Sequence, residues 1–102
     1  MATSKDYRDF LLEQLSLLDD ILCRPMMGEY LLYYKSKLFG GIYDSRLLIK
    51  ITSTNHKYNL KEAIPYEGAK AMYMIENLDD KETIRQIVID TCDGLPNKNK
   101  VK

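Results

Sequence analysis

Residues 24–50 read RPMMGEYLLYYKSKLFGGIYDSRLLIK, and this stretch decides the fold. It contains three runs rich in aromatic and aliphatic residues, at 28–35, 38–43 and 46–52, with two residues between one run and the next. Such runs are typical of β-strands, and two-residue connections favour hairpins. The stretch therefore predicts a three-stranded antiparallel meander.

The third run predicts a strand with two different faces. Alternate positions are apolar on one side and mostly cationic on the other: Leu47, Ile49 and Ile51 against Arg46, Leu48 and Lys50. Because side chains alternate across a strand, we expect one buried face and one face that carries two cations.

The glycine pair Gly40-Gly41 lies inside the second run. Glycine weakens a strand, so a pair there predicts a bulge or a close approach by another backbone. We favour a packing site for the first helix over a phosphate cradle, because no Gly-x-Gly-x-x-Gly or Walker pattern surrounds the pair.

Helical patterns flank the meander. Residues 4–22 predict an amphipathic helix capped by Thr3 or Ser4, which Pro25 would stop. Its apolar positions recur every three or four residues, at Tyr7, Phe10, Leu11, Leu15, Leu18, Ile21 and Leu22. A final helix is predicted to begin at Asp79, with Glu82 completing a capping box. We expect its apolar face at Ile84, Ile87, Val88 and Thr91 or Cys92, and its end at Gly94 and Pro96.

The region between the meander and the last helix is less regular. Residues 55–63 predict a short helix, 64–70 a loop containing Pro65 and Gly68, and 71–76 a fourth strand. The expected fold is α+β: an antiparallel sheet of about four or more strands, meander first, with N- and C-terminal helices packed on it. We predict one domain over 1–96 and a frayed polar tail over 97–102.

Composition narrows the possible functions. Fifteen Lys plus Arg balance fifteen Asp plus Glu over 102 residues, so no general field attracts nucleic acid or anionic lipid. Cys23 and Cys92 lie among apolar residues, which indicates buried free thiols. The N-terminus lacks the apolar core of a signal peptide, and no apolar run approaches the ~20 residues of a membrane span. A cytoplasmic protein is therefore expected.

No catalytic or metal site is recognisable. His56 is the only histidine and lies at a predicted helix start, so we expect a solvated residue, no metal and no cofactor. Eight tyrosines interleaved with cations could stack single-stranded bases, but filling of a thin core is the stronger interpretation. Tyrosines also favour protein interfaces.

Three blocks in order resemble the TfoX/Sxy N-terminal domain family: RPMMGEY at 24–30, GGIYDSRLLIK at 40–50 and PYEGAKAM at 65–72. The resemblance extends over roughly 5–96. It implies an α+β fold and a relation to bacterial competence regulators, which are thought to help a transcription activator. Those regulators carry a second, C-terminal domain, and we expect this sequence to be a standalone N-terminal-type domain.

The family motif maps onto a candidate binding surface, and the resemblance implies no catalytic role for any of it. The candidate surface comprises Met27, Glu29, Tyr43, Asp44, Arg46, Lys50, Tyr66, Glu67 and Lys70, with structural glycines Gly28, Gly40, Gly41 and Gly68.

Three functions stay open. The first is a non-enzymatic regulatory or protein-interaction module, with a homodimer or a regulatory protein as partner. The second is a small-ligand binder or unrecognised enzyme that uses a polar site around Glu29, Asp44 and Lys50, together with Arg46, Tyr66 and Lys70; these side chains are then expected to converge on one pocket. The third is a nucleic-acid binder, although direct binding of nucleic acid and attachment to a membrane are not expected.

Overall fold

The computed structural model describes residues 3–96 and is organised around one six-stranded antiparallel sheet in the order β1-β2-β3-β4-β6-β5. The strands are β1 (Ile21–Met26), β2 (Glu29–Tyr34), β3 (Lys37–Tyr43), β4 (Arg46–Ile49), β5 (Lys61–Ala63) and β6 (Met72–Ile75). The helices are α1 (Lys5–Gln14), the short 3₁₀ helix η1 (His56–Tyr58) and α2 (Lys81–Asp93). The predicted α+β class, the meander and the terminal helices are confirmed. The predicted tail over 97–102 lies outside the described residues.

Tight turns of one kind connect the first four strands. Both residues of each turn have positive φ: 52° and 85° at 27–28, 50° and 70° at 35–36, and 53° and 58° at 44–45. Positive φ at both central residues matches the right-handed twist of a hairpin. The turn at 44–45 falls where the sequence predicts it, and the turn predicted at 36–37 lies one residue earlier.

The predicted helix over 4–22 is too long. Ser4 caps α1 by accepting a hydrogen bond from the Tyr7 amide, but the helix ends at Gln14. Ile21 and Leu22 instead begin β1, which pairs with β2 along its whole length. The strand pairing overrides the helical spacing of the apolar residues. Pro25 lies within this edge strand, where a missing amide hydrogen is tolerated.

The segment after β4 also differs from prediction. Instead of a helix over 55–63, the chain forms only η1 and then the edge strand β5. The fourth predicted strand, 71–76, is confirmed as β6.

The last helix is confirmed, but its cap is not. Asp80 rather than Asp79 caps α2, accepting hydrogen bonds from the Thr83 amide (3.1 Å) and the Thr83 hydroxyl (2.7 Å). Thr83 therefore takes the place expected for Glu82. The predicted apolar face is buried at Ile84, Ile87, Val88, Thr91 and Cys92.

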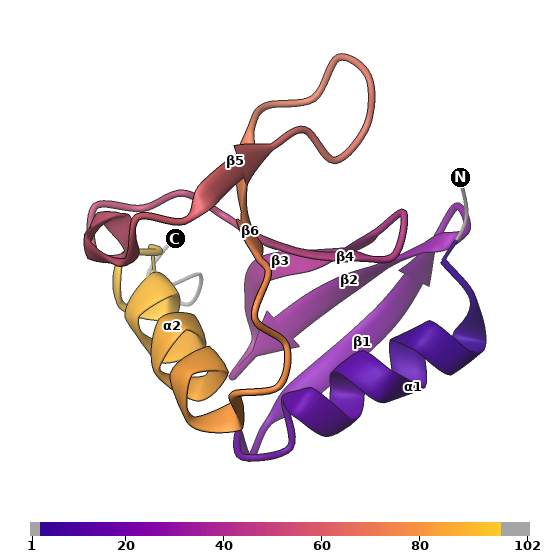
Figure 1. Ribbon diagram of the computed structural model, residues 1–102, viewed down its shortest axis with the longest axis horizontal. Helices are drawn as coiled ribbons and strands as arrows, with labels where there is room; N and C mark the ends of the chain where they lie inside the picture. The colour runs from indigo at the N-terminus through magenta and orange to yellow at the C-terminus, as the bar shows by residue number, and fades with distance from the viewer. Residues whose placement is uncertain (1–2, 97–102) are drawn as a thin grey trace.

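Both helices cover the same face of the sheet. Figure 1 shows α1 and α2 below the strands, with the loop over residues 64–71 extending above them. The core joins helix residues such as Leu11 and Val88 to strand residues such as Leu32 and Ile49. We call this side the helix-covered face.

The other side of the sheet is not simply a solvated face. Residues paired across strands point to the same side, so Leu31, Gly41, Leu48 and Met74 lie opposite the core. Leu48 is nonetheless 0% exposed. The predicted alternation is confirmed at β4, because Leu47 and Ile49 belong to the core and Arg46, Leu48 and Lys50 alternate onto the other side. We call this side the loop-covered face.

The glycine pair permits close contacts within the sheet. A Cβ on Gly40 would lie 2.1 Å from the Leu48 carbonyl oxygen, and one on Gly41 would lie 2.5 Å from the Tyr30 carbonyl oxygen. The pairing register also shifts at this point, which leaves Phe39 as an extra residue in β3. The predicted bulge is confirmed. The excluding atoms belong to neighbouring strands, so the expectation of a helix-packing site is wrong.

Candidate functional site

A cavity of about 580 Å³ opens on the loop-covered face. Its lining comes from β3 and the residues just after β4 on one side, and from the loop over 64–71 and the start of β6 on the other. The lining residues are Leu38, Gly40, Tyr43, Lys50, Ile51, Pro65, Tyr66, Ala69, Lys70, Ala71 and Met72. We call this the Lys50–Lys70 cavity. Its volume is in the range of pockets that bind small molecules.

Arg46 holds the loop onto the sheet. Its Nε donates to the Tyr43 carbonyl (3.1 Å), and one Nη donates to the carbonyls of Ile64 (3.1 Å) and Pro65 (3.3 Å). The rings of Tyr43 and Tyr66 add a tilted contact, with centroids 6.1 Å apart. The Arg46 guanidinium therefore serves the architecture of the cavity, because its hydrogen bonds go to backbone carbonyls.

The charge in the cavity has one sign. Lys50 and Lys70 contribute two ammonium groups, and the lining contains no carboxylate. Within residues 3–96, neither lysine forms an ion pair. Desolvation by burial raises the pKa of Tyr43, and the nearby Tyr66, Glu29 and Tyr33 raise it further. Tyr43 thus stays a neutral hydroxyl that can donate to a ligand.

Lys50 is positioned through its backbone. Its amide donates to the Phe39 carbonyl (2.8 Å), and its carbonyl accepts from Nδ2 of Asn55 (2.8 Å). Asn55 is 0% exposed, and its Nδ2 also donates to Thr91 Oγ1 (2.9 Å), which in turn donates to the Ile87 carbonyl (2.8 Å). A chain of hydrogen bonds thus runs from α2 to the end of β4.

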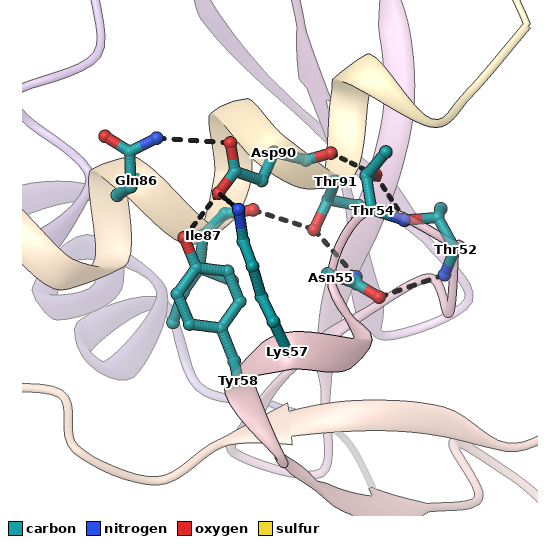
Figure 2. Close-up of polar contacts among 9 residues, drawn as sticks. All are labelled: Thr52, Thr54, Asn55, Lys57, Tyr58, Gln86, Ile87, Asp90 and Thr91. Atoms are coloured by element: carbon teal, nitrogen blue, oxygen red, sulfur yellow. Dashed lines mark hydrogen bonds and ion pairs between the residues drawn. The ribbon is translucent and has the colours of Figure 1, made fainter.

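Figure 2 shows the polar network to which Asn55 belongs. Asn55 Oδ1 accepts from the Thr52 amide (3.0 Å), and Thr54 Oγ1 donates to the Asp90 carbonyl. The sequence analysis places residue 55 only at the start of a short predicted helix, and the buried network around Asn55 is not predicted.

A second cluster in Figure 2 ties η1 to α2. Asp90 accepts from the Tyr58 hydroxyl and from Gln86 (3.1 Å), and it pairs with Lys57 (3.1 Å). The hydrogen bond from Tyr58 is the main cause that lowers the pKa of Asp90. Burial, followed by the bond to Asp90, raises the pKa of Tyr58 to about 12. None of these four residues lines the described cavities, so the cluster fastens two elements together.

The candidate surface from the sequence is only partly gathered. Tyr43, Lys50, Tyr66 and Lys70 line the cavity together with Gly40. Arg46 braces its wall.

The remaining candidates lie elsewhere. Glu29 accepts from the Thr3 hydroxyl (2.6 Å) and from the Asp44 amide (3.1 Å), so it shapes the turn at 44–45. The exposed residues are Met27 and Gly28 in the β1–β2 turn, Asp44 in the β3–β4 turn, and Glu67 and Gly68 in the loop over 64–71. The expected convergence of Glu29 and Asp44 with Lys50 is therefore not found.

Other kinds of site find little support in residues 3–96. No group of three His, Cys, Asp or Glu side chains there could hold a metal ion. Cys23 and Cys92 are free thiols, and burial raises the pKa of Cys92 to about 11. In the same part of the chain, no helix combines the length and apolar character needed to cross a membrane.

Comparison with known proteins gives a distant relative. No protein-family profile matches the chain. An uncharacterized 12.7 kDa protein in the trpE 5′ region of Spirochaeta aurantia is 28% identical over 99 residues. The match covers 94% of this chain and 86% of that protein. The similarity makes that protein a distant homologue, and neither finding assigns a family or an activity.

Proposed function

We propose that this protein binds a small organic anion in the Lys50–Lys70 cavity. The observation that carries the proposal is that two lysine ammonium groups line the cavity and no carboxylate does. Ammonium groups without carboxylate partners attract an anion, and a partly desolvated site strengthens that attraction. The neutral Tyr43 hydroxyl supplies a further donor.

The rest of the lining favours an organic ligand over a bare inorganic ion. Leu38, Ile51, Pro65 and Met72 offer apolar surface next to the charges. Ligand sites commonly combine such a lining with a few placed polar groups. The site contains no nucleophile–base pair, so the proposed function is binding rather than catalysis.

The proposal is tested by titrating the protein with small carboxylates and following backbone amide NMR signals. Shifts should saturate and should concentrate on the residues that line the cavity. The double variant Lys50→Gln/Lys70→Gln should lose saturable binding. Lys5→Gln, at the start of α1, removes a charge from the helix-covered side and serves as the matched control.

A second candidate function is a regulatory or protein-interaction module of the TfoX type, acting as a homodimer or on a protein partner. It is supported by the resemblance of residues 24–50 and by exposed apolar side chains around β1. Leu22 is 53% exposed on that edge strand, and Met27 in the adjoining turn is 97% exposed. Edge strands with such residues are prone to pair with another chain.

Light scattering of the purified protein tests this second candidate. A defined dimer that dissociates in the Leu22→Ser/Met27→Ser variant is the expected result. A monomer at all accessible concentrations, with no transcription factor recovered in a pull-down, would count against it.

A further inference from the structure

A second, smaller cavity adjoins the Lys50–Lys70 cavity. It measures about 230 Å³ and is lined by Lys37, Leu38, Lys50, Leu95 and Pro96. Leu38 and Lys50 belong to both cavities. The two cavities are therefore neighbours on either side of these two shared side chains.

The smaller cavity offers apolar surface rather than a second free charge. Lys37 Nζ donates to the carbonyls of Cys92 (3.0 Å) and Leu95 (3.5 Å), so its ammonium already serves the end of α2. Leu38, Leu95 and Pro96 make up the rest of the wall together with the Lys50 stem. Long lysine stems of this kind cover apolar surface.

The larger cavity does not favour a flat ring as its ligand. Tyr43 and Tyr66 pack against each other with an interplanar angle of 54°, which does not form a parallel-sided slot for a base or another planar ring. Phosphate binding commonly uses a helix N-terminus or an arginine fork. None of the described helices begins at the cavity lining, and Arg46 is engaged by backbone carbonyls.

We infer that the anion is a straight-chain carboxylate of the fatty-acid type, its acid group between Lys50 and Lys70 and its chain lying along Leu38 toward Leu95. This inference rests on the proposed function and adds the ligand class. The acid group meets Lys50 and Lys70, whereas the Lys37 ammonium is engaged by the carbonyls at the end of α2. The chain gains apolar contact in both cavities, which a compact anion could not reach.

Calorimetric titration of the full chain with butanoate, hexanoate and octanoate tests the inference, with benzoate and inorganic phosphate as compact anions. Each added methylene should tighten binding about two- to fourfold, as burial of methylene groups predicts. Leu95→Gln, which keeps the side-chain size, should weaken octanoate about tenfold and leave butanoate nearly unchanged. Lys50→Gln should weaken all three chains about tenfold or more. Amide shifts at Leu38 and Leu95 on addition of octanoate give an independent readout.

Two results would overturn the inference in different ways. Saturable binding of benzoate or phosphate, lost in Lys50→Gln but independent of chain length and of Leu95, refutes the fatty-acid class and retains the proposed function. Absence of saturable binding by every anion refutes both. Circular dichroism of Leu95→Gln and Lys50→Gln confirms that a loss does not arise from unfolding.

Discussion

The two faces of the sheet solve the same problem, the exclusion of water from apolar strands, by different means. On the helix-covered face, α1 and α2 pack against Leu32, Ile42 and Ile49, each 0% exposed. On the loop-covered face, Leu48 is equally buried, but a loop braced by Arg46 leaves a cavity beside it. Helices fill space with regular ridges, whereas a loop can cover a face and still leave room for a ligand. The difference separates a face that stabilises the protein from a face that can bind.

The largest expected loss of stability comes from a substitution on the helix-covered face. Ile49→Ala should lower the free energy of unfolding by about 4 kcal/mol, because the lost side chain leaves a cavity in a packed core. Leu38→Ala, on the loop-covered face, should cost only about 1 kcal/mol since Leu38 is half-buried and lines an existing cavity. Urea denaturation measures both values. Equal losses would contradict the division of roles between the faces.

Alanine substitutions at two glycines, one in the sheet and one in the loop over 64–71, should differ in their effect on stability. Gly40→Ala should destabilise by about 3 kcal/mol or more, because its Cβ would meet the backbone of Leu48 and Ile49 at 2.1 and 2.8 Å. Gly68→Ala should cost about 1 kcal/mol, from its φ of +87° alone, since nothing lies within 4 Å of an added Cβ. Thermal unfolding checks this order, and a reversed order would show that the sheet contact at Gly40 is wrong.

Asn55 connects the two faces. Asn55→Ala should lower the free energy of unfolding by about 2 kcal/mol, because the Thr52 amide and the Lys50 carbonyl lose their hydrogen-bond partner away from solvent. Anion affinity should fall as well, since the Lys50 backbone is then less well held. Ser53→Ala, an exposed change in the same loop, is the control and should alter neither quantity. If Asn55→Ala kept full affinity, the network would have no part in placing Lys50.

Removing the Arg46 guanidinium should increase the mobility of the loop over 64–71 more than it lowers the stability of the whole protein. Arg46→Met deletes the hydrogen bonds to Ile64 and Pro65 and should cost about 1 kcal/mol. Amide hydrogen exchange over residues 64–71 should accelerate while exchange in β2 and β3 stays slow. Arg24→Met on the exposed side of β1 is the matched control. Uniform acceleration across the sheet would argue against a local role for Arg46.

The smallest expected effect concerns alkaline pH. The folded pKa of Tyr58, about 12, lies above its ordinary value of 10.0, so the neutral hydroxyl is favoured by folding. Its contribution to stability is full below pH 10 and is lost as the pH rises toward 12. Wild type should therefore lose stability more steeply over this window than Tyr58→Phe, as urea midpoints at several pH values would show. Parallel curves would contradict the bond between Tyr58 and Asp90.

Local patterns were enough to predict the meander and the last helix. The alternation in residues 46–49 and the two-residue turns leave few arrangements for a chain, and Ile84, Ile87 and Val88 define a helix face by spacing alone. The same reasoning failed at Ile21 and Leu22. Their spacing fits a helix, and only the long-range pairing with Tyr34 and Tyr33 makes them a strand.

The cavity could be predicted only in part, because its lining residues come together through long-range contacts. Lys50, Tyr66 and Lys70 belong to the candidate surface that the family resemblance implies, but the sequence does not show which of its residues lie together. Glu29 and Asp44 are candidates on the same grounds as Lys50. In the structure the Glu29 carboxylate instead accepts a hydrogen bond from the Asp44 backbone amide, beside the turn at 44–45. Asn55 acts through the backbone of Lys50 and through Thr91 in α2, and these contacts leave no pattern in the sequence.

The most direct test of the account is the titration of wild type and Lys50→Gln/Lys70→Gln with octanoate, followed by amide NMR. The account predicts saturable shifts at Leu38, Lys50, Tyr66 and Ala69 in wild type, no comparable shifts on the helix-covered face, and their loss in the double variant but not in Lys5→Gln. Shifts spread evenly over both faces, or binding that survives in the double variant, would contradict the claim that the loop-covered face is the binding site.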